Sequence, residues 1–481
     1  MTFDLAIAGN GVLGLSSAFA FHRLAPSATI AIIGPGDRPG GATLAAGAMH
    51  GVFGEVTALT SASPHMLLKF GWALEARKHW PAWRDAINAR VPVNRQVEST
   101  GGTIVVLNSV SGRIDDEAYL EIARLLALYG EPHEALDPSM VPGLAPLEDC
   151  RPFRALHIPG EGRIDPARLL AGLTEALRRT ERVSFIDDEA TGIRVEGGWA
   201  AGLALRSGTV VRSGRTLVAA GAGTAPLMAS VPEVSSRMPG VFAGVGCSLE
   251  VARSGCAIDH VVRTPNRSFA CGLHALPGNG GHLYIGATNY LKTAPQVRPT
   301  LSDVHFLIDC AVAQIGETIQ GGHLVEAKVG NRPVSLDGLP LIGGTCVGGL
   351  FVLTGTYRDG IHLSPLLADR IARQMLADGT EPEPDFPVER RPIPLSDWAI
   401  TKTRAVDHFM SVLYENQAAL PRCGWQALQR DHLRSKVERL YADLDTDFPL
   451  PPEFLPIIDL RRETMVPFFR DAIRSLQSAH S

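Results

Sequence analysis

A glycine-rich turn near the start of the chain places the strongest constraint on the fold. The segment Gly9-Asn10-Gly11-Val12-Leu13-Gly14 follows a short apolar run and precedes apolar residues at helical spacing. Strand, tight turn and helix in this order form the phosphate-binding unit of dinucleotide-binding domains. Gly9 permits the turn, Gly11 lets a pyrophosphate approach the backbone, and Gly14 lets the helix pack on the strand. The alternative is a glycine-rich turn of an ordinary α/β protein, but the flanking strand and helix favour nucleotide binding.

One element of a dinucleotide site is missing. An Asp or Glu is expected at the end of the second strand, where it would hold the adenosine ribose. Gly34-Pro35-Gly36 follows residues 29–33 instead. Asp37 is the nearest acid, and backbone groups are the alternative; the sequence leaves both open. Arg38 suits either a phosphate or a solvated loop.

A segment near residue 355 indicates a second ligand-binding region. Residues 350–353 are apolar and predict a buried strand, after which Gly355 and Gly360 let the backbone come close to a flat ligand. Ser364-Pro365 predicts the start of a helix that runs to Gly379. The positive end of its dipole would face a ligand that carries negative charge. A well-capped helix of any α/β domain is the alternative.

Length and composition indicate a multidomain enzyme. A chain of 481 residues favours about two or three domains. The formal net charge of −5 argues against nucleic acid as the main partner. The sequence contains no run of 18 apolar residues, so no membrane span is expected. The N-terminal residues lack the basic start of a secretory signal. The seven Cys are scattered without a C-x-x-C motif, which favours reduced thiols and a cytoplasmic location over zinc or redox-dithiol chemistry.

Several segments within residues 1–380 together resemble the family of FAD-dependent amine oxidases that includes D-amino acid oxidase, sarcosine oxidase and glycine oxidase, and most of all glycine oxidase. Besides the two regions above, these segments are Thr43-Leu44-Ala45-Ala46-Gly47-Ala48-Met49, residues 162–170, residues 217–223, residues 283–288, Gly330-Asn331-Arg332-Pro333 and residues 337–343. The combination is more specific than any single segment.

The resemblance implies an α/β fold with three parts. These are an FAD-binding Rossmann-like domain of the amino-acid-oxidase type, an antiparallel-sheet substrate domain and a helical C-terminal extension beyond the family pattern. The expected ranges are 1–75, 151–235 and 326–385 for the FAD-binding domain, 76–150 and 236–325 for the substrate domain, and 386–481 for the extension. Apolar residues repeat at helical spacing over 406–413 and 433–444 of the extension. These stripes favour packing against the parent domain or against a second subunit of a homo-oligomer over a role as an active-site lid.

The resemblance also implies which residues hold FAD. The flavin is expected to be noncovalent, because Gly330 stands near the position where covalent family members carry a Cys. The expected cofactor-binding residues are Gly9, Gly11, Val12, Leu13, Gly14, Gly34, Asp37, Thr43, Ala46, Gly47, Ala48, Met49, Ala190, Gly221, Gly355, Asp359, Gly360 and Ile361.

Arg332 is the residue that the resemblance assigns to substrate recognition. Arginine binds a carboxylate as a planar fork that a lysine cannot imitate. Arg358, next to Tyr357, resembles a second family arginine near the same pocket, with an ordinary ion pair as the equal alternative.

Three further positions in the predicted pocket depart from family members. Tyr284 stands where sarcosine oxidase has a lysine, His274 where glycine oxidase presents a tyrosine, and His50 where an apolar residue is usual. For each histidine the alternative is a purely structural role. As pocket residues, the two histidines together predict a substrate that is not plain glycine and that carries a second polar group.

The implied reaction is an amine oxidation. Hydride passes from the substrate Cα to flavin N5, the imine hydrolyses to a keto acid or aldehyde, and O2 is reduced to H2O2. The partners are a small-molecule amine or amino acid and O2, and no acid–base residue is assigned, because the cofactor carries the chemistry. Two alternatives stay open: a flavin dehydrogenase of a 2-hydroxy acid or amine that uses a quinone or carrier protein, and a non-catalytic flavin-bound interaction protein.

Overall fold

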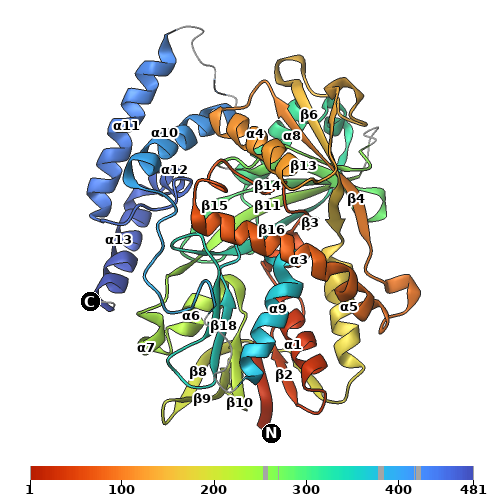
Figure 1. The fold of residues 1–481 in the computed structure, drawn as a ribbon, viewed down its shortest axis with the longest axis vertical. Coiled ribbons are helices and arrows are strands. Elements are labelled where there is room, and N and C mark those ends of the chain that lie inside the picture. The colour runs from red at the N-terminus through yellow and green to blue at the C-terminus, as the bar shows by residue number, and fades with distance from the viewer. Residues whose placement is uncertain are drawn as a thin grey trace.

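The computed structural model describes residues 2–252, 258–268, 270–377, 384–416, 418 and 424–479. Two sheets organise the chain, with a layer of helices against each and a helical group along one side (Figure 1). The predicted α/β class with a helical C-terminal region is confirmed. No helix of the described residues is long and apolar enough to cross a membrane.

The smaller sheet contains the N-terminal strand. Its parallel core has the order β18-β10-β1-β2-β7, and β17 pairs antiparallel with β18 at one edge. A hairpin of β8 and β9 extends the sheet from β10. The strands are β1 (Thr2–Ala8), β2 (Ile30–Ile33), β7 (Val183–Ile186), β8 (Ala190–Glu196), β9 (Trp199–Leu205), β10 (Val210–Val218), β17 (Leu341–Gly344) and β18 (Leu350–Thr354).

Helices cover this sheet because their apolar faces match its buried strands. On one face the core joins α1 (Val12–Leu24), α3 (Pro64–Asn88), α5 (Pro166–Arg178) and α9 (Gly360–Leu376). On the other face a second core contains α6 (Thr224–Met228) and α7 (Pro232–Ser235). The carboxyl ends of β1 and β18 lead directly into the glycine turn and into the segment before α9. Both predicted ligand-binding segments therefore meet at one edge of the sheet.

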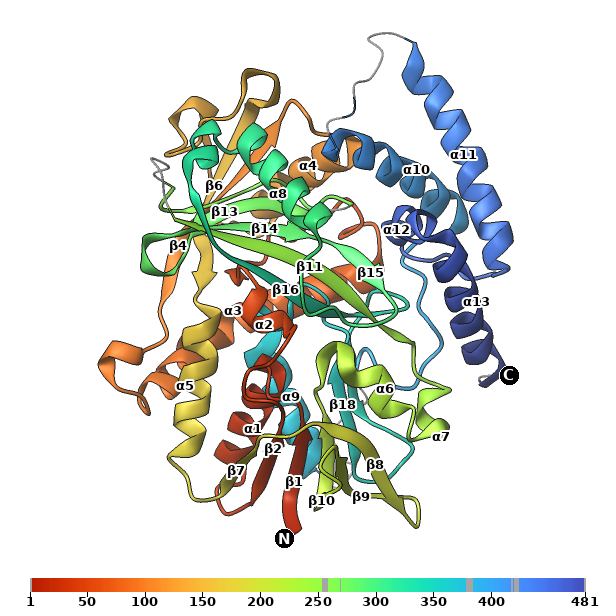
Figure 2. The same cartoon turned by 180° about the vertical axis from the view of Figure 1, so that it is seen from behind.

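The larger sheet is mainly antiparallel and lies above the first (Figure 2). Its order is β15-β11-β14-β13-β12-β4-β6-β3, with β16 paired to β11 and β5 to β6. The strands are β3 (Met49–His50), β4 (Ser99–Asn108), β5 (Glu134–Leu136), β6 (Pro152–Ile164), β11 (Val241–Ala252), β12 (Val261–Arg263), β13 (Ala270–Pro277), β14 (Leu283–Thr288), β15 (Tyr290–Lys292) and β16 (His323–Ser335). The helices α4 (Arg113–Leu128) and α8 (Leu301–Gln314) pack beside it.

The two sheets divide the chain at residues that differ from the expected ranges. Strand β6 and residues 326–335 of β16, which the sequence analysis placed in the FAD-binding domain, pair within the larger sheet. The reason is continuity of pairing: β16 follows β11 along almost its whole length, so Arg332 stands opposite Gly244 in the same ladder as residues before 326.

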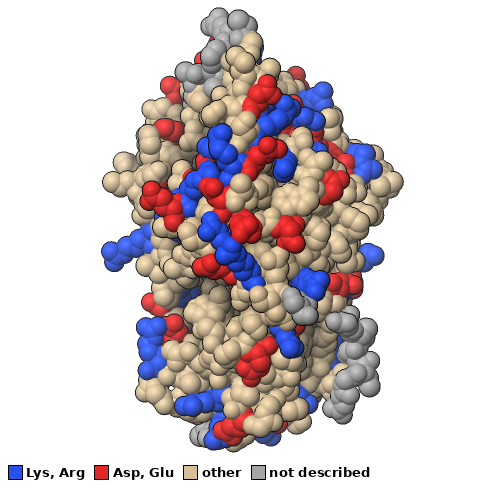
Figure 3. All heavy atoms as spheres, turned by 90° about the vertical axis from the view of Figure 1, so that its left-hand side faces the viewer, with Lys and Arg blue, Asp and Glu red and all other residues tan. Residues whose placement is uncertain are grey.

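The C-terminal extension packs on its own chain. It contains α10 (Trp398–Glu415), α11 (Trp425–Leu444), α12 (Phe454–Leu460) and α13 (Arg462–Ala479). A further short helix, α2 (Ala42–Ala45), lies near the N-terminus of the chain. The predicted apolar stripes of α10 and α11 are buried in one core with Phe242, Val334 and Tyr357 of the parent domains. The opposite, solvent-facing side mixes positive and negative side chains (Figure 3).

Candidate active site

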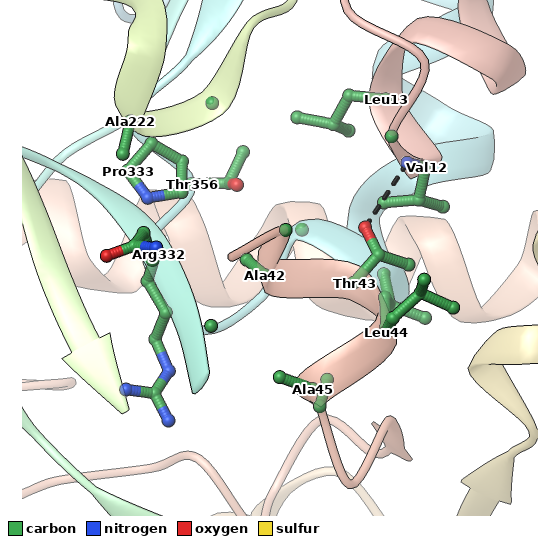
Figure 4. Close-up of a pocket in the computed structure, with 18 of the residues that line it drawn as sticks. Val12, Leu13, Ala42, Thr43, Leu44, Ala45, Ala222, Arg332, Pro333 and Thr356 are labelled. Carbon is green, nitrogen blue, oxygen red and sulfur yellow. Dashed lines mark hydrogen bonds between the residues drawn. The ribbon is translucent and has the colours of Figure 1, made fainter. Parts of the chain in front are cut away.

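A cavity of about 460 Å³ lies between the two sheets, and most of the predicted site residues line it (Figure 4). It extends from the glycine turn past α2 to Arg332 on β16. Four of the predicted residues, Gly14, Asp37, His50 and Gly355, do not line it. All the others do, namely Gly9, Gly11, Val12, Leu13, Gly34, Thr43, Ala46, Gly47, Ala48, Met49, Ala190, Gly221, His274, Tyr284, Arg332, Tyr357, Arg358, Asp359, Gly360 and Ile361.

The glycine turn has the geometry of a phosphate cradle. Gly9 has a φ of +118°, and a Cβ on it would lie 2.2 Å from the carbonyl oxygen of Ala219. A Cβ on Gly14 would lie 1.9 Å from the oxygen of Gly9, so Gly14 serves the packing of α1 on β1 from outside the cavity. No side chain caps α1 at Gly11, and among the first three N–H groups of the helix that of Val12 donates to Thr43 Oγ1 at 3.3 Å (Figure 4). The remaining N–H groups fit a pyrophosphate.

The end of β2 offers Arg38 and backbone groups in place of an acid. Asp37 is exposed and lies outside the cavity, so it is not placed to hold the ribose. Arg38 lines the cavity and donates from Nε to the carbonyl oxygen of Asn10 at 3.0 Å. The Asn10 amide in turn donates to the oxygen of Pro35 at 2.9 Å, which ties the glycine turn to the loop after β2.

Helix α9 begins at Gly360, four residues earlier than the predicted start at Ser364, and the described part ends at Leu376. Gly379, the expected end, lies outside the described residues. Pro365 lies inside the helix and cannot donate to the carbonyl oxygen of Ile361, which instead accepts a hydrogen bond from the Ser364 hydroxyl at 2.9 Å. The earlier start brings the helix N-terminus to the cavity wall, while Gly355 packs against Leu339 outside it.

Gly330 leaves no room for a covalent attachment residue. A Cβ there would lie 2.8 Å from the Cβ of Ala45 and 3.1 Å from the Cα of Ala42 on α2. Since a Cys side chain would collide with this helix, the local packing agrees with a flavin that is not tethered at this position.

Arg332 stands at the substrate end of the cavity. Its side chain extends on the opposite side from Val12 and Leu13 (Figure 4), and Nη1 donates to the carbonyl oxygen of Thr288 at 3.2 Å. Gly246 makes space for the guanidinium, because a Cβ there would lie 2.4 Å from Nη1. Among the described residues, no carboxylate forms an ion pair with Arg332. A half-buried arginine without a counter-charge is suited to bind an anionic ligand.

Tyr284 and His274 form a stacked pair beside Arg332. The ring centroids lie 5.7 Å apart at an interplanar angle of 17°, and the Tyr284 hydroxyl donates to the oxygen of Ala45 at 2.8 Å. Burial raises the pKa of Tyr284 to about 12, and burial lowers the pKa of His274 to about 4. The His274 Nδ1 lies 2.8 Å from the carbonyl oxygen of Gly272, which places the proton there and leaves Nε2 as an acceptor.

Arg358 is an ion-pair partner as well as a cavity residue. Its Nη2 lies 3.0 Å from the Tyr357 hydroxyl and 3.6 Å from Glu453 Oε2 in the C-terminal extension. The guanidinium carbon also lies 4.6 Å from the Tyr357 ring centroid. Both interpretations of Arg358 that the sequence left open are therefore compatible with its position.

His50 is not in the cavity, which corrects its predicted role. It packs against Trp80, and its Nδ1 lies 3.1 Å from His362 Nδ1, while His362 itself lines the cavity. Side chains alternate between the faces of a strand, so Met49 at the cavity directs His50 away from it. Burial and the neighbouring His362 lower the pKa of His50 to about 3.

Glu55 is a cavity residue that the sequence analysis missed. It lies 2.7 Å from Arg263 Nη1 and 3.0 Å from the Asn266 amide, and 24 % of its side chain remains exposed. Burial acts to raise its pKa, but Arg263 and Arg358 outweigh burial and hold the pKa at about 2. No local motif marks Glu55, because its partners come from a distant strand and loop.

The fold and the cavity define a dinucleotide-binding protein. The family described as FAD dependent oxidoreductase matches residues 4–374, and the chain belongs to this family. FAD is therefore the cofactor, and the glycine turn, α2 and the start of α9 are the segments that fit it.

Relatives and solved structures agree with this assignment. The glycine oxidase of Geobacillus kaustophilus (strain HTA426) is 28% identical over 388 residues, which cover 78% of this chain and 94% of the relative. The crystal structure of glycine oxidase from Geobacillus kaustophilus has a TM-score of 0.67 at 26% identity over 81% of this chain and 99% of that chain. Iminodiacetate oxidase from Chelativorans sp. BNC1 shares the fold, with a TM-score of 0.66 at 21% identity over 80% of this chain and 98% of that chain.

Proposed function

We propose that the protein oxidises an amino acid or a related amine through noncovalently bound FAD and passes the electrons to O2. The observation that carries this proposal is Arg332, a cavity arginine that donates to the backbone carbonyl of Thr288 and forms no ion pair with a carboxylate of the described residues. A carboxylate is the ligand group that best complements its planar fork. The glycine oxidase relatives support the same substrate class.

The residues of the chain supply binding and orientation. Bound FAD would supply the hydride-accepting chemistry for oxidation at the substrate Cα, with O2 as the electron acceptor that is reduced to H2O2. Arg332 holds the substrate carboxylate and fixes the direction of Cα. His274 is neutral, so its Nε2 is able to accept a hydrogen bond from the substrate amine without repelling it.

The substrate is an amine other than plain glycine. His274 is wedged between Tyr284 and Gly47, where a Cβ would lie 3.0 Å from His274 Nε2, so the imidazole faces the substrate end of the cavity. A site with a fixed polar group discriminates against ligands that leave it unpaired. His50 adds nothing to this argument, because it lies outside the cavity.

Anaerobic mixing of the purified holoenzyme with a panel of amino acids and secondary amines tests the proposal. We expect loss of the oxidised-flavin absorbance with at least one substrate, and H2O2 in a peroxidase-coupled assay after O2 is admitted. Bleaching that is followed by slow reaction with O2 and fast reduction of a dye would favour the dehydrogenase instead. A flavin that no amine or 2-hydroxy acid bleaches would favour the non-catalytic alternative.

A further inference from the structure

A second cavity of about 110 Å³ adjoins the substrate end of the first. The two cavities share four lining residues, Glu55, Tyr357, Arg358 and Asp359. We call the smaller cavity the distal chamber. It is large enough for a group of several non-hydrogen atoms.

The C-terminal extension forms one wall of the distal chamber. This wall consists of Leu395, Arg404, His408, Pro451, Pro452 and Glu453. The family match ends at residue 374, before every one of these positions. This wall of the chamber therefore comes from a part of the chain beyond the family match.

The extension is also bound to the substrate site itself. Glu453 pairs with Arg358 at 3.6 Å, and Tyr357 is buried in the same apolar core as α10 to α13. Because Arg358 and Tyr357 line both cavities, the extension fixes the boundary between them.

Charges around the distal chamber are matched in pairs. Lys69 lies 2.6 Å from Asp359, Glu55 pairs with Arg263, and Arg358 pairs with Glu453. Arg267 pairs with Asp115, and Arg404 with Glu117. A ligand group with a formal charge would lack a counter-charge there and would meet the cost of burying an unpaired ion.

His408 adds a neutral acceptor to the chamber. Burial lowers its pKa to about 3, with Arg358 and Arg404 acting in the same direction. Its Nδ1 lies 2.8 Å from Ser268 Oγ, whose hydroxyl also donates to the His408 carbonyl oxygen at 3.1 Å. This arrangement assigns the imidazole proton to Nδ1 and leaves Nε2 as an acceptor.

We propose that the distal chamber is a substrate subsite that takes a polar, uncharged side-chain group, such as a carboxamide or hydroxyl, of the amino acid or amine. The inference rests on the proposed function and specifies its substrate class. Arg332 holds the carboxylate, and the substrate side chain extends past Glu55 and Arg358 to the wall that the extension supplies.

Two variants probe the chamber. Ala58→Leu fills it, because half-buried Ala58 is one of its lining residues. Glu453→Gln removes the charge that holds Arg358. Ala86→Leu, half-buried but outside both cavities, controls for the added volume. Glu438→Gln, which also faces a cation at 3.6 Å within the extension but is exposed, controls for the lost charge.

The readouts are kcat/KM and the dissociation constant from flavin absorbance changes under anaerobic conditions, for both enantiomers of asparagine, glutamine, leucine, lysine and glutamate, and for glycine. We expect the holoenzyme to prefer a carboxamide over leucine, lysine and glutamate. Ala58→Leu should lower the carboxamide-to-glycine ratio of kcat/KM at least tenfold, with weaker binding of the carboxamide. Glu453→Gln should lower this ratio in the same direction, and both controls should leave it unchanged.

Other results would overturn the inference. A wild-type preference for a charged or apolar side chain, or an unchanged ratio in folded, flavin-loaded Ala58→Leu, would show that the chamber takes no such group. If glycine or another amine still bleaches the flavin in that case, only the subsite is wrong. If no amine bleaches it in the wild type, the proposed function fails.

Discussion

The carboxylate of Glu55 lies 2.7 Å from the guanidinium of Arg263, a residue that is 1 % exposed and more than 200 positions away in the chain. The pair joins the loop after β3 to the strand β12 of the larger sheet. It fixes an anionic group at the meeting point of the two cavities, and it has a consequence for stability.

Glu55→Gln should destabilise the protein, because it leaves the buried Arg263 without its counter-charge. We expect the free energy of unfolding to fall by about 2–4 kcal/mol, as measured by urea denaturation. The double variant Glu55→Gln, Arg263→Leu should recover part of this loss. Asp431→Asn, which breaks an exposed pair with Arg434, serves as the control and should change stability by about 0.5 kcal/mol or less. Equal effects of Glu55→Gln and Asp431→Asn would contradict a buried role for the Glu55 charge.

Arg332→Lys should weaken substrate binding and leave the fold intact. Loss of the two-pronged carboxylate contact is expected to cost on the order of 2–4 kcal/mol, or about 30- to 1000-fold in apparent affinity. Among the described residues, the Arg332 side chain donates to the Thr288 carbonyl and forms no ion pair, so the melting temperature should barely change. Steady-state kinetics together with thermal melts separate the two effects. Unchanged affinity would mean that no substrate carboxylate binds at Arg332.

The flavin should leave the protein on acid precipitation. Gly330 and its contact with Ala45 leave no room for a thiol at the position of covalent attachment. We therefore expect FAD in the supernatant, identified by chromatography and by its absorbance spectrum. Flavin that stays in the pellet after denaturation would disprove noncovalent binding.

Stability should fall as the pH drops below 6.5, in part through His50. Its pKa is lowered to about 3 in the folded protein, so the unfolded state binds the proton first as pH falls. The contribution of neutral His50 to the free energy of unfolding is fully present above pH 6.5 and is lost as the pH falls toward 3. Between pH 7 and pH 5 this difference amounts to about 1–2 kcal/mol.

Urea denaturation of wild type and His50→Gln at pH 7 and pH 5 measures the contribution of His50 to this pH dependence. The variant should show a smaller loss of stability between pH 7 and pH 5. His274 and His408 shift in the same direction, do not contact His50 and remain in both proteins, so they contribute equally to each curve. An identical pH dependence in the two proteins would show that His50 is not buried as a neutral group.

The sequence alone predicted the features that depend on neighbouring residues, namely the glycine turn and the helices of the extension. The turn from Gly9 to Gly14 needs small residues at fixed spacing, and the structure places it at the carboxyl end of β1. The apolar periodicity of residues 406–413 and 433–444 likewise predicted helices with one buried face, which α10 and α11 confirm. In both cases the information lies within about one turn of backbone or one helix face, so neighbouring residues suffice to carry it.

Tertiary structure alone decided how distant side chains meet. The sequence offered His50 as a pocket residue, but the alternation along β3 turns it toward His362 and Trp80. Glu55 enters the cavity because Arg263 holds it there, and Glu453 reaches Arg358 because the extension folds back onto the larger sheet. Residue spacing carries no signal for such contacts, since they depend on the packing of elements that lie far apart in the chain. The sequence by itself thus determined the cofactor-binding turn and the element types, whereas the shape and charge balance of the substrate end arise only when both sheets and the extension come together.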